Sequence, residues 1–501
     1  MNSKYQLPSS NLNLFSRSLT EHEGIEYGLA QTEEGSRLAV LADPDSPMLL
    51  SFEGEISPLQ NRTLCLCPLN GHNASALRAQ LPWLQPRPLG LKTSAGMGDR
   101  LGLATPGHVR AVRAVGEEIA PIFAQQSMRE MARTGRTPQQ VMDDATWGIF
   151  QEGWQKDVGA DADHLKSPAD INICLAAGFT FFTIDPGDHV DNRAENADLS
   201  LLRELAEKLP ADVQLEESGL LGKDFDIEGL SLHLDEATLL KAAVKYGRAV
   251  AHVVMMYRHL EQAAGQRPVE LEVSVDETDQ PTSHAEHVYI ASELKRMGVN
   301  WVSLAPRYIG RFEKGVDYIG DPSMNSGQAL AAFEADLAGH AAIARHFGPY
   351  KLSLHSGSDK FSIYPAAMRQ TRGLVHLKTA GTSYLEALRT IAAIDIDLFQ
   401  EIYTFARQRY ESDKLSYHVS AELERAPLPE AVTDWLGLLE QFDVREILHV
   451  TFGSVLTEKT ADQRWRFYDR FMDLLRANSE AYADNLEKHF MRHLQPFISG
   501  D

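Results

Sequence analysis

Cysteine is scarce in this chain, and long apolar runs are missing from it. Only Cys65, Cys67 and Cys174 stand among 501 residues, too few for the disulfide framework of a small secreted domain. No apolar run approaches the roughly 20 residues that a membrane-spanning helix needs. Met1 to Leu19 lacks the charged and then apolar arrangement of a secretory signal. We therefore expect a cytoplasmic protein without a membrane segment.

Basic residues are also in short supply. The chain carries 48 lysines and arginines against 70 aspartates and glutamates, a formal net charge of -22. Because binding to a phosphate backbone requires a basic surface, this balance argues against nucleic acid as a general partner. It does not exclude a small anionic substrate held by a few local arginines or lysines. The apolar fraction, 43%, is ordinary for a soluble globular enzyme.

The most informative stretch runs from Val269 to Glu277, where apolar residues alternate with acidic or polar ones. This is the period of a β-strand. Strongly helical segments flank it at 236–264 and 284–297, so we expect a parallel strand covered by helices on its outer side. Its carboxylates then point into a closed barrel, where ionised groups are tolerated only beside a cation or a proton donor. The alternative is a solvated edge strand of an antiparallel sheet.

Three regions differ in pattern. Residues 1–86 indicate a small β-rich addition, 87–459 form the main domain, and 460–501 are a helical extension. The short β-type runs of the first region lie at 37–41, 48–52 and 63–69. The apolar face of the extension packs either on the barrel or on a neighbouring subunit, which would make a homo-oligomer. His489 and His493 share one face of that helix, and without a carboxylate partner we expect surface residues.

The main domain alternates β-type runs with helical ones. We expect eight strands, at Leu89–Ser94, Ile122–Ser127, Thr180–Asp185, Val269–Asp276, Asn300–Ala305, Lys351–His355, Leu374–Thr379 and Ile447–Phe452. This alternation predicts an α/β fold, a (β/α)8 barrel of the TIM type that carries the N-terminal addition and the C-terminal helices. A doubly wound open sheet is the main rival. The glycines of 96–102 have the wrong spacing for a dinucleotide fingerprint, so no nicotinamide cofactor is expected.

Histidines and carboxylates gather where the predicted strands end, which is where such a barrel places its active site. Asp188 and His189 follow the third predicted strand, Asp276 and Glu277 end the fourth, and His355 ends the sixth. Histidine and carboxylate ligands from separate strands suit a divalent metal that keeps positions open for substrate. We predict His189, Asp276 and His355 as the ligands, which suit Mn, Zn, Co and Ni alike.

Positive side chains gather at the same rim. They are Arg307, Arg311, Lys360 and Lys378. Arginine forks bind carboxylate or phosphate groups through two parallel hydrogen bonds, so we predict that these four residues bind an anionic substrate. The structural alternative is that Arg307 or Arg311 pairs with Glu313 or Asp317 to support the loop.

Six strings of this sequence resemble the bacterial tagaturonate epimerases. They are GDRLGLATPGH at 98–108, FTIDPGDHVD at 182–191, EVSVDET at 272–278, LAPRYIGRFEKGVDYIGD at 304–321, SLHSGSDKFSIYP at 353–365 and HLKTAGTSYL at 376–385. The resemblance extends from about residue 90 to residue 460. It implies a metal-dependent hexuronate 4-epimerase that interconverts D-tagaturonate and D-fructuronate in uronate catabolism. It also implies an acid and a base on either side of the metal.

The chemistry of that reaction limits the mechanism. C4 is not next to the C2 carbonyl, so removal of a proton from C4 has no electron sink, and transient oxidation would need a nicotinamide. Retro-aldol cleavage of C3–C4 avoids both problems, because the aldehyde fragment can rotate before it rejoins an enediolate. We assign the base to Asp188 and the opposing acid to Glu272 or Glu277. Because side chains alternate along a strand, Glu277 points to the opposite face from Glu272, unless the strand bends at its end.

Two other functions fit the same residues. A metal-dependent aldolase would release the two fragments instead of rejoining them, and a three-carbon product from tagaturonate would identify it. A non-catalytic barrel that binds sugar acids would keep both its binding and its thermal stability after dialysis against a chelator.

Overall fold

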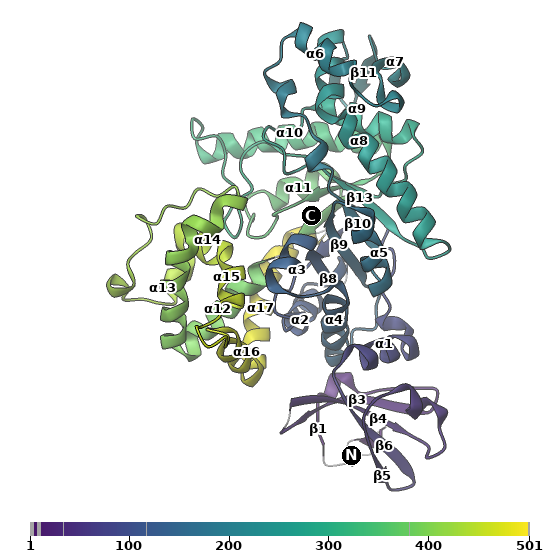
Figure 1. The fold of residues 1–501 in the computed structure, drawn as a ribbon, viewed down its shortest axis with the longest axis vertical. Helices are drawn as coiled ribbons and strands as arrows, with labels where there is room; N and C mark the ends of the chain where they lie inside the picture. Colours follow the sequence, from purple (N-terminus) through teal and green to yellow (C-terminus); the bar gives the residue numbers. More distant parts are fainter. Residues whose placement is uncertain (1–4, 8–11, 34, 117, 380, 499–501) are drawn as a thin grey trace.

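Eight parallel strands close into a barrel at the centre of the computed structural model, which describes residues 5–7, 12–33, 35–116, 118–379 and 381–498 (Figure 1). The barrel strands are β7 (Ser94–Gly96), β8 (Ala120–Ser127), β9 (Gly159–Leu165), β10 (Phe181–Ile184), β13 (Glu270–Ser274), β14 (Ser303–Ala305), β15 (Lys351–Leu354) and β16 (Val375–Lys378). They pair in chain order, and β16 pairs with β7 to close the ring. The closed ring confirms the predicted (β/α)8 barrel and excludes the open doubly wound sheet.

The central strand β13 is enclosed on both faces, since all five of its residues are buried. Leu271 and Val273 belong to the apolar core outside the ring. Glu272 contacts His355 and Lys378, which come from across the barrel. The acidic face therefore points inward, as expected, and the solvated edge strand is excluded.

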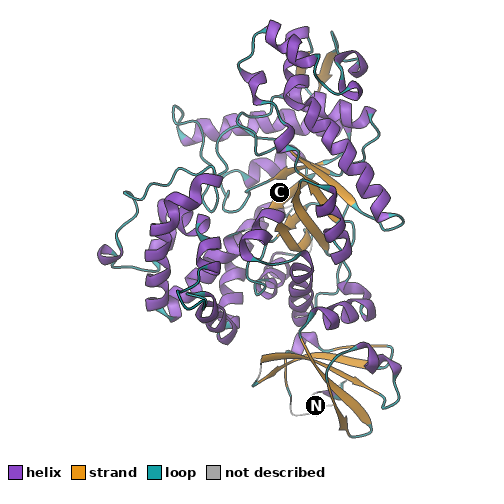
Figure 2. Cartoon of the chain, in the orientation of Figure 1, coloured by secondary structure: helices purple, strands orange, loops and turns teal. Residues whose placement is uncertain are grey.

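Helices surround the barrel strands, which Figure 2 draws in orange. They are α2 (Thr105–Val115), α3 (Met128–Thr134), α4 (Pro138–Glu152), α5 (Pro168–Ala177), α8 (Glu236–Ala264), α9 (His284–Arg296), α10 (Ser326–Phe347), α11 (Tyr364–Thr371) and α12 (Thr382–Ile394). Four of them begin with a capping box, in which the N-cap side chain and the third helical residue bond each other's backbone. These N-caps are Thr137, Ser167, Ser283 and Asn325.

Two of the strand predictions for the barrel need correction. The run 447–452 is helical, because it lies across α14 (Phe442–Val450) and the start of α15 (Phe452–Thr457). Val444, Ile447 and Leu448 recur at helical spacing and are buried, so packing overrides the β propensity of the run. The strand that completes the ring is β9, which the sequence interpretation missed. The first predicted run also stops where β7 begins, at Ser94.

The N-terminal region is an antiparallel sheet that lies at one end of the molecule (Figure 1). Its strands are β1 (Asn13–Leu14), β2 (Thr20–His22), β3 (Ile25–Thr32), β4 (Gly35–Ala42), β5 (Glu55–Leu59) and β6 (Arg62–Pro68). The predicted strand at 48–52 is wrong, because the chain forms a 3-10 helix there that begins at Pro47. A proline at the first helical position favours that start. Helix α1 (Gly71–Gln80) leads from the sheet toward the barrel.

Two further groups of elements lie outside the ring. Between β10 and α8 come α6 (Leu199–Ala206), α7 (Leu215–Ser218) and a hairpin of β11 (Asp224–Ile227) and β12 (Leu230–His233). After α12 come α13 (Ile396–Asp413), α14, α15, α16 (Tyr468–Ala477) and α17 (Ser479–Leu494). Helix α17 packs along α2 and α12 of the same chain. Within the described residues, no helix combines the length and apolar character needed to span a membrane.

Candidate metal centre and active site

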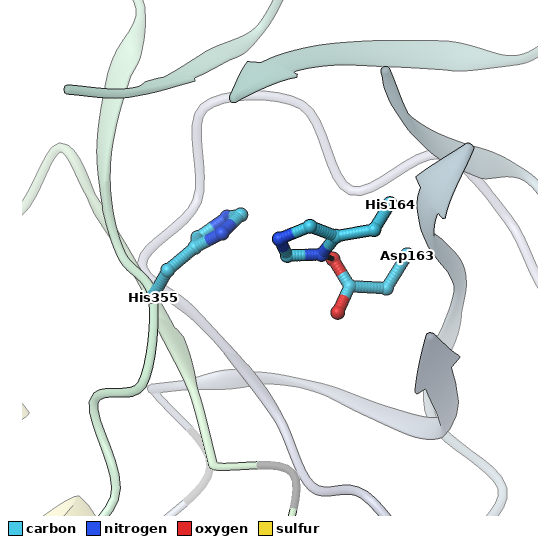
Figure 3. Close-up of side chains that lie close together, drawn as sticks. All are labelled: Asp163, His164 and His355. Carbon is cyan, nitrogen blue, oxygen red and sulfur yellow. Dashed lines mark ion pairs between the residues drawn. The ribbon is translucent and has the colours of Figure 1, made fainter. Parts of the chain in front are cut away.

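The ends of three barrel strands bring titratable side chains together. Asp163 and His164 lie near the end of β9, Asp276 follows β13, and His355 follows β15. Ligand atoms of Asp163, His164 and His355 all lie within 4.8 Å of one another. Figure 3 shows the two imidazole rings facing each other, with the Asp163 carboxylate against the His164 ring. This is a grouping of histidine and carboxylate from separate strands, of the kind that holds a divalent cation.

Each imidazole has one nitrogen held by a carboxylate and the other nitrogen directed at Asp276. For His355, Nε2 lies 2.6 Å from Oε1 of Glu272, and Nδ1 lies 3.2 Å from Oδ1 of Asp276. For His164, Nδ1 lies 2.9 Å from Oδ1 of Asp163, and Nε2 lies 3.7 Å from Oδ1 of Asp276. A metal-binding histidine almost always gives its second nitrogen to such a partner, which fixes the ring and its tautomer.

The charge balance of the cluster favours a cation. Burial opposes protonation of His355, but the carboxylates of Asp276 and Glu272 outweigh it and raise the pKa of His355 to about 9. Burial likewise opposes protonation of His164, yet Asp163 holds its pKa well above the ordinary value. Both imidazoles therefore retain protons because negative charge is in excess. A divalent ion can replace those protons, since metal binding displaces protons from its ligands.

The residues present fit a divalent ion. Both ring nitrogens of His164 are buried and neither makes a hydrogen bond among the described residues, although Nδ1 lies beside the Asp163 carboxylate. Glu277 offers a further carboxylate oxygen, 3.8 Å from Nε2 of His164. Two imidazoles and a choice of carboxylates form a donor set that suits Mn, Zn, Co or Ni.

The backbone of β9 explains why neighbouring residues share the cluster. In a regular strand Asp163 and His164 would point to opposite faces. His164 instead adopts a left-handed conformation with φ of 55°, and the pairing of β9 with β10 shifts register between Ala162 and Leu165, on either side of it. Such irregularities re-aim side chains next to active sites, and a left-handed histidine is strained. Ser356, directly after His355, is also left-handed, with φ of 48°.

The buried side chain of Lys378 neutralises part of the negative charge of the carboxylates in the cluster. Nζ of Lys378 lies 2.7 Å from Asp163, 2.9 Å from Glu272 and 3.0 Å from Asp161. Burial favours loss of its proton, but the three carboxylates raise its pKa above the ordinary value. Burial in turn opposes ionisation of Glu272, yet Lys378 and His355 hold its pKa well below the ordinary value. Lys378 thus keeps charged the carboxylates that orient the two histidines.

A cavity of about 370 Å³ opens above the cluster. Its cationic lining consists of Arg129, Arg307, Arg311 and Lys314. A smaller adjoining cavity contains Asp163, His164 and Lys378, and Glu277 and Lys314 line both. Glu277 contacts Arg129 at 2.6 Å, so the chain bends after β13 and turns this carboxylate into the cavity. The cavity therefore offers carboxylates near the cluster and positive charge at its walls.

The four cations predicted from the sequence divide into three positions. Arg307 and Arg311 line the large cavity, and Arg311 also lies 3.3 Å from Glu313. Lys378 lies beneath the cluster. Lys360 is fully buried and donates to the backbone carbonyls of Glu313, Val316 and Ser358, so its ammonium group supports loops instead of facing the cavity.

Asp188 and His189 are not among the side chains that meet at the cluster; Asp188 is linked to it through Lys166, which also lies 3.7 Å from Asp185, a carboxylate grouped with His164 and Glu277. The chain turns away after Ile184 through a 3-10 helix, Gly187–His189, whose residues are not buried. The Asp188 side chain is 70% exposed and pairs with Lys166 at 2.9 Å. The His189 ring stacks on His252 at 4.1 Å. The structure thus places His164 where the sequence analysis expected His189, because β9 was not recognised as a strand.

One signal in the sequence could have revealed β9. Residues 159–165 read Gly-Ala-Asp-Ala-Asp-His-Leu, which alternates small with acidic residues in the way that the central strand alternates valine with glutamate. Asp161 and Asp163 both point inward to Lys378. Other cavity residues, such as Arg129, Lys314 and Tyr417, come from helices and loops without a recognisable pattern.

The C-terminal helix supports the loop that follows His355, and this corrects the expectation for its histidines. His489 and His493 of α17 are buried, not on the surface. Nε2 of His489 lies 3.2 Å from Oδ1 of Asp359, and Nε2 of His493 accepts a hydrogen bond of 2.9 Å from the Asp359 backbone. The carboxylate partner that the sequence analysis did not find is thus distant in the chain. The extension packs on its own barrel at this point.

Known proteins resemble this chain along almost its whole length. The sequence pattern of the tagaturonate epimerase family matches residues 15–497. The tagaturonate/fructuronate epimerase of Thermotoga maritima is 43% identical over 485 residues, which cover 96% of each chain. Two crystal structures of fructuronate-tagaturonate epimerase UxaE from Cohnella laeviribosi, native and with one glycerol, share 38% identity, a TM-score of 0.90 and 98% coverage of both chains. The chain belongs to the tagaturonate epimerase family.

Proposed function

We propose that this protein is a divalent-metal-dependent epimerase that inverts C4 of a 2-ketohexuronate and so interconverts D-tagaturonate and D-fructuronate. Membership of the epimerase family supports the substrate pair. The observation that carries the proposal is the convergence of His164, His355 and Asp276 below a cavity with arginines in its wall. A cation site beside a positively charged wall suits the two ends of a keto acid.

His164, His355 and Asp276 are the residues that would hold the ion, and Asp163 and Glu272 hold the two rings in place. This set keeps Asp276 and His355 from the sequence prediction and has His164 in place of His189. When bound, a divalent ion supplies positive charge that stabilises the negative charge developing on the ketose oxygens.

The bond changes follow the retro-aldol route. A carboxylate takes the proton of the C4 hydroxyl, the C3–C4 bond breaks, and its electron pair moves to the C2 carbonyl. The products are an enediolate of C1 to C3 and an aldehyde that carries the C6 carboxylate. Rotation about C4–C5 presents the opposite face of the aldehyde, and rejoining inverts C4. The atoms and electrons balance without a redox cofactor.

Glu277 is our candidate for the carboxylate that moves the proton, because it lines both cavities beside the cluster. Glu272, the other candidate acid, is fully buried against His355 and has a positioning role. Lys314 also lines both cavities, and burial lowers its pKa. A lysine with a lowered pKa can carry a proton, so we assign Lys314 as the second proton carrier. Asp188, the base predicted from the sequence, is too exposed for this role.

The C6 carboxylate must stay bound while the aldehyde turns. Arg307 and Arg311 line the cavity and are suited to a carboxylate, because the guanidinium fork donates two parallel hydrogen bonds. An anchored carboxylate leaves the C4–C5 bond free to rotate and prevents escape of the fragment. This retention is what separates an epimerase from an aldolase.

The test is an NMR experiment in D2O with metal-loaded protein and tagaturonate. We expect fructuronate that retains hydrogen at C4, because the retro-aldol route never breaks the C4–H bond. Deuterium at C4 would overturn the route, and steady release of three-carbon fragments would favour the aldolase. Loss of all turnover after dialysis against a chelator, with recovery on addition of Mn, Zn, Co or Ni, tests the metal.

A further inference from the structure

A second group of metal-ligating side chains lies outside the active site, between α9 and α10. His284 is the first residue of α9, and Asp336 and His340 lie one turn apart on α10. One ligand atom from each lies within 4.8 Å of the others. Nε2 of His284 is 3.5 Å from Oδ1 of Asp336, and Nε2 of His340 is 3.8 Å from Oδ2. The spacing of four residues places Asp336 and His340 on the same helix face.

Two of these ligand atoms are buried without a hydrogen-bond partner among the described residues. They are Nε2 of His340, a residue with 0% exposure, and Oδ2 of Asp336. Buried polar atoms are almost always paired, so two unpaired atoms facing each other call for an explanation. A cation between them satisfies both.

The other nitrogen of His340 already has the partner that a metal-binding histidine requires. Nδ1 of His340 lies 2.9 Å from Nδ1 of His287, and Nε2 of His287 lies 2.8 Å from the Tyr350 hydroxyl. When hydrogen bonds run from His340 to His287 to Tyr350, Nε2 of His340 has a free lone pair. A bound cation favours this direction of the hydrogen bonds from His340 to His287 to Tyr350.

Another buried histidine cluster provides a contrast. Nε2 of His493 accepts from the Asp359 backbone N–H, and its Nδ1 lies 3.1 Å from the His489 carbonyl oxygen. Both ring nitrogens of His493 are therefore occupied. Nε2 of His489 has no hydrogen-bond partner among the described residues, but it lies 3.2 Å from Oδ1 of Asp359, close enough for direct pairing with that carboxylate. Outside the active site, the cluster on α10 differs in that the unpaired atoms of two described residues, Nε2 of His340 and Oδ2 of Asp336, lie 3.8 Å apart.

His284 gives the cluster an opening to solvent. Its side chain is 22% exposed, and its Nε2 lies 2.9 Å from the Asp336 carbonyl oxygen, a contact that it would exchange for the ion. Gly339 makes this position accessible to the ring, because a Cβ there would lie 2.4 Å from two atoms of His284. The exposed side leaves room for water as a fourth ligand, which completes a tetrahedron.

We propose that His284, Asp336 and His340 bind a second divalent cation, of the zinc class, that joins α9 to α10. Two imidazoles and one carboxylate suit zinc, whose structural sites are commonly tetrahedral. The site lies behind the loop that follows β14, since the Ile309 backbone bonds Asp336 and the Tyr308 ring meets His340 at 5.8 Å. Because that loop carries Arg307, the ion would stabilise a wall of the substrate cavity without touching substrate.

Counting bound zinc tests this proposal. Wild type, Asp336→Asn and a His164→Ala/His355→Ala protein are stripped with a chelator, loaded with Zn²⁺, freed of excess and analysed by mass spectrometry. We expect two ions per chain in the wild type, one in each variant, and none when the three substitutions are combined. Turnover of Asp336→Asn stays within twofold of wild type. Glu334→Gln, a change at a half-buried carboxylate of the same helix that pairs with Arg369 instead of His340, is the matched control and keeps two ions.

Thermal unfolding gives a second measurement. In the His164→Ala/His355→Ala protein, zinc at a hundredfold excess over its Kd raises the unfolding midpoint by roughly 2–3 °C, and Asp336→Asn abolishes the shift. The proposal is overturned if that protein binds no zinc, or if Asp336→Asn leaves the zinc count unchanged in the wild type. If the proposed catalytic metal site is the one that is wrong, the result differs: wild type and the His164→Ala/His355→Ala protein would then bind equal amounts of zinc.

Discussion

Glu272 forms a hydrogen bond with His355 inside the barrel, with Oε1 of the carboxylate 2.6 Å from Nε2 of the imidazole. This contact directs Nδ1 of His355 at Asp276, and both partners are almost completely buried. We predict that Glu272→Gln weakens metal binding and lowers kcat/KM about 10- to 100-fold, because such partners fix the ligand's orientation and basicity. Metal titration followed by activity at saturating metal separates the two effects.

Glu270 provides the matched control on the same face of the same strand. Its carboxylate accepts hydrogen bonds from the backbone of Leu89 and Gly90 at the opposite end of the barrel, away from the cluster. Glu270→Gln should lower stability but leave metal affinity unchanged. Equal loss of metal affinity in both variants would assign the effect to the strand and not to the contact with His355.

His164 and His189 distinguish the site seen in the structure from the one expected from the sequence. We predict that His164→Ala loses the catalytic metal and at least 1,000-fold in kcat/KM, since one of three proposed ligands is removed. His189→Ala should keep both within a few fold, because that ring stacks on His252 outside the cluster. Metal analysis of the two purified variants decides between them, and metal loss in His189→Ala alone would reverse our assignment.

Much of the barrel could be predicted because alternation is a strong signal where a strand is buried on both faces. The central strand β13 shows it through Leu271 and Val273 in the apolar core outside the ring and Glu272 against Lys378 and His355 inside it. The run 447–452 was wrongly predicted as a strand, because β-branched residues that recur at helical spacing also suit a buried helix. Short strands such as β7, with only three residues, carry too little sequence for a pattern.

Site residues could be predicted where a residue type that binds metals stands at the end of a recognisable strand. Asp276 and His355 end recognisable strands, and the structure brings them to 3.2 Å. His164 was missed because β9 was not recognised as a strand, and regular alternation along β9 would have placed it outside the barrel, since its left-handed backbone is what turns it inward. Pairs such as Asp359 with His489 are also invisible to local pattern, since 130 positions separate the two residues and only folding joins them.

Glu277 is the residue on which the proton transfer depends. We predict that Glu277→Gln lowers kcat about 100- to 10,000-fold with a small change in KM, because removal of a general base affects the chemical step more than binding. Asp279→Asn is the control, because Asp279 lines the same large cavity without lining the smaller one. Steady-state kinetics at several pH values measures both. Retention of more than a tenth of wild-type kcat would remove Glu277 from the mechanism.

Glu446 makes stability fall as the pH rises. Burial, and then the neighbouring Glu313 carboxylate, raise the pKa of Glu446 from 4.5 to about 9. The two glutamates accept hydrogen bonds from the Ser420 and Ala421 backbone, in the segment that brings Tyr417 and His418 to the cavity. Between pH 4.5 and about 9 the folded state keeps a proton that the unfolded state has lost. The contribution of Glu446 to the free energy of unfolding is therefore complete below pH 4.5. It declines as the pH rises toward about 9, by up to about 1.4 kcal/mol per pH unit.

Glu446→Gln tests this relationship, because the amide keeps a donor toward Glu313 without a proton to lose. We expect a variant whose unfolding midpoint, followed by circular dichroism from pH 6 to pH 9, declines less steeply than that of the wild type. At pH 8 the variant should be the more stable of the two, since the wild type must hold a proton against the solvent. Parallel slopes would show that Glu313 and Glu446 do not share a proton in the folded protein.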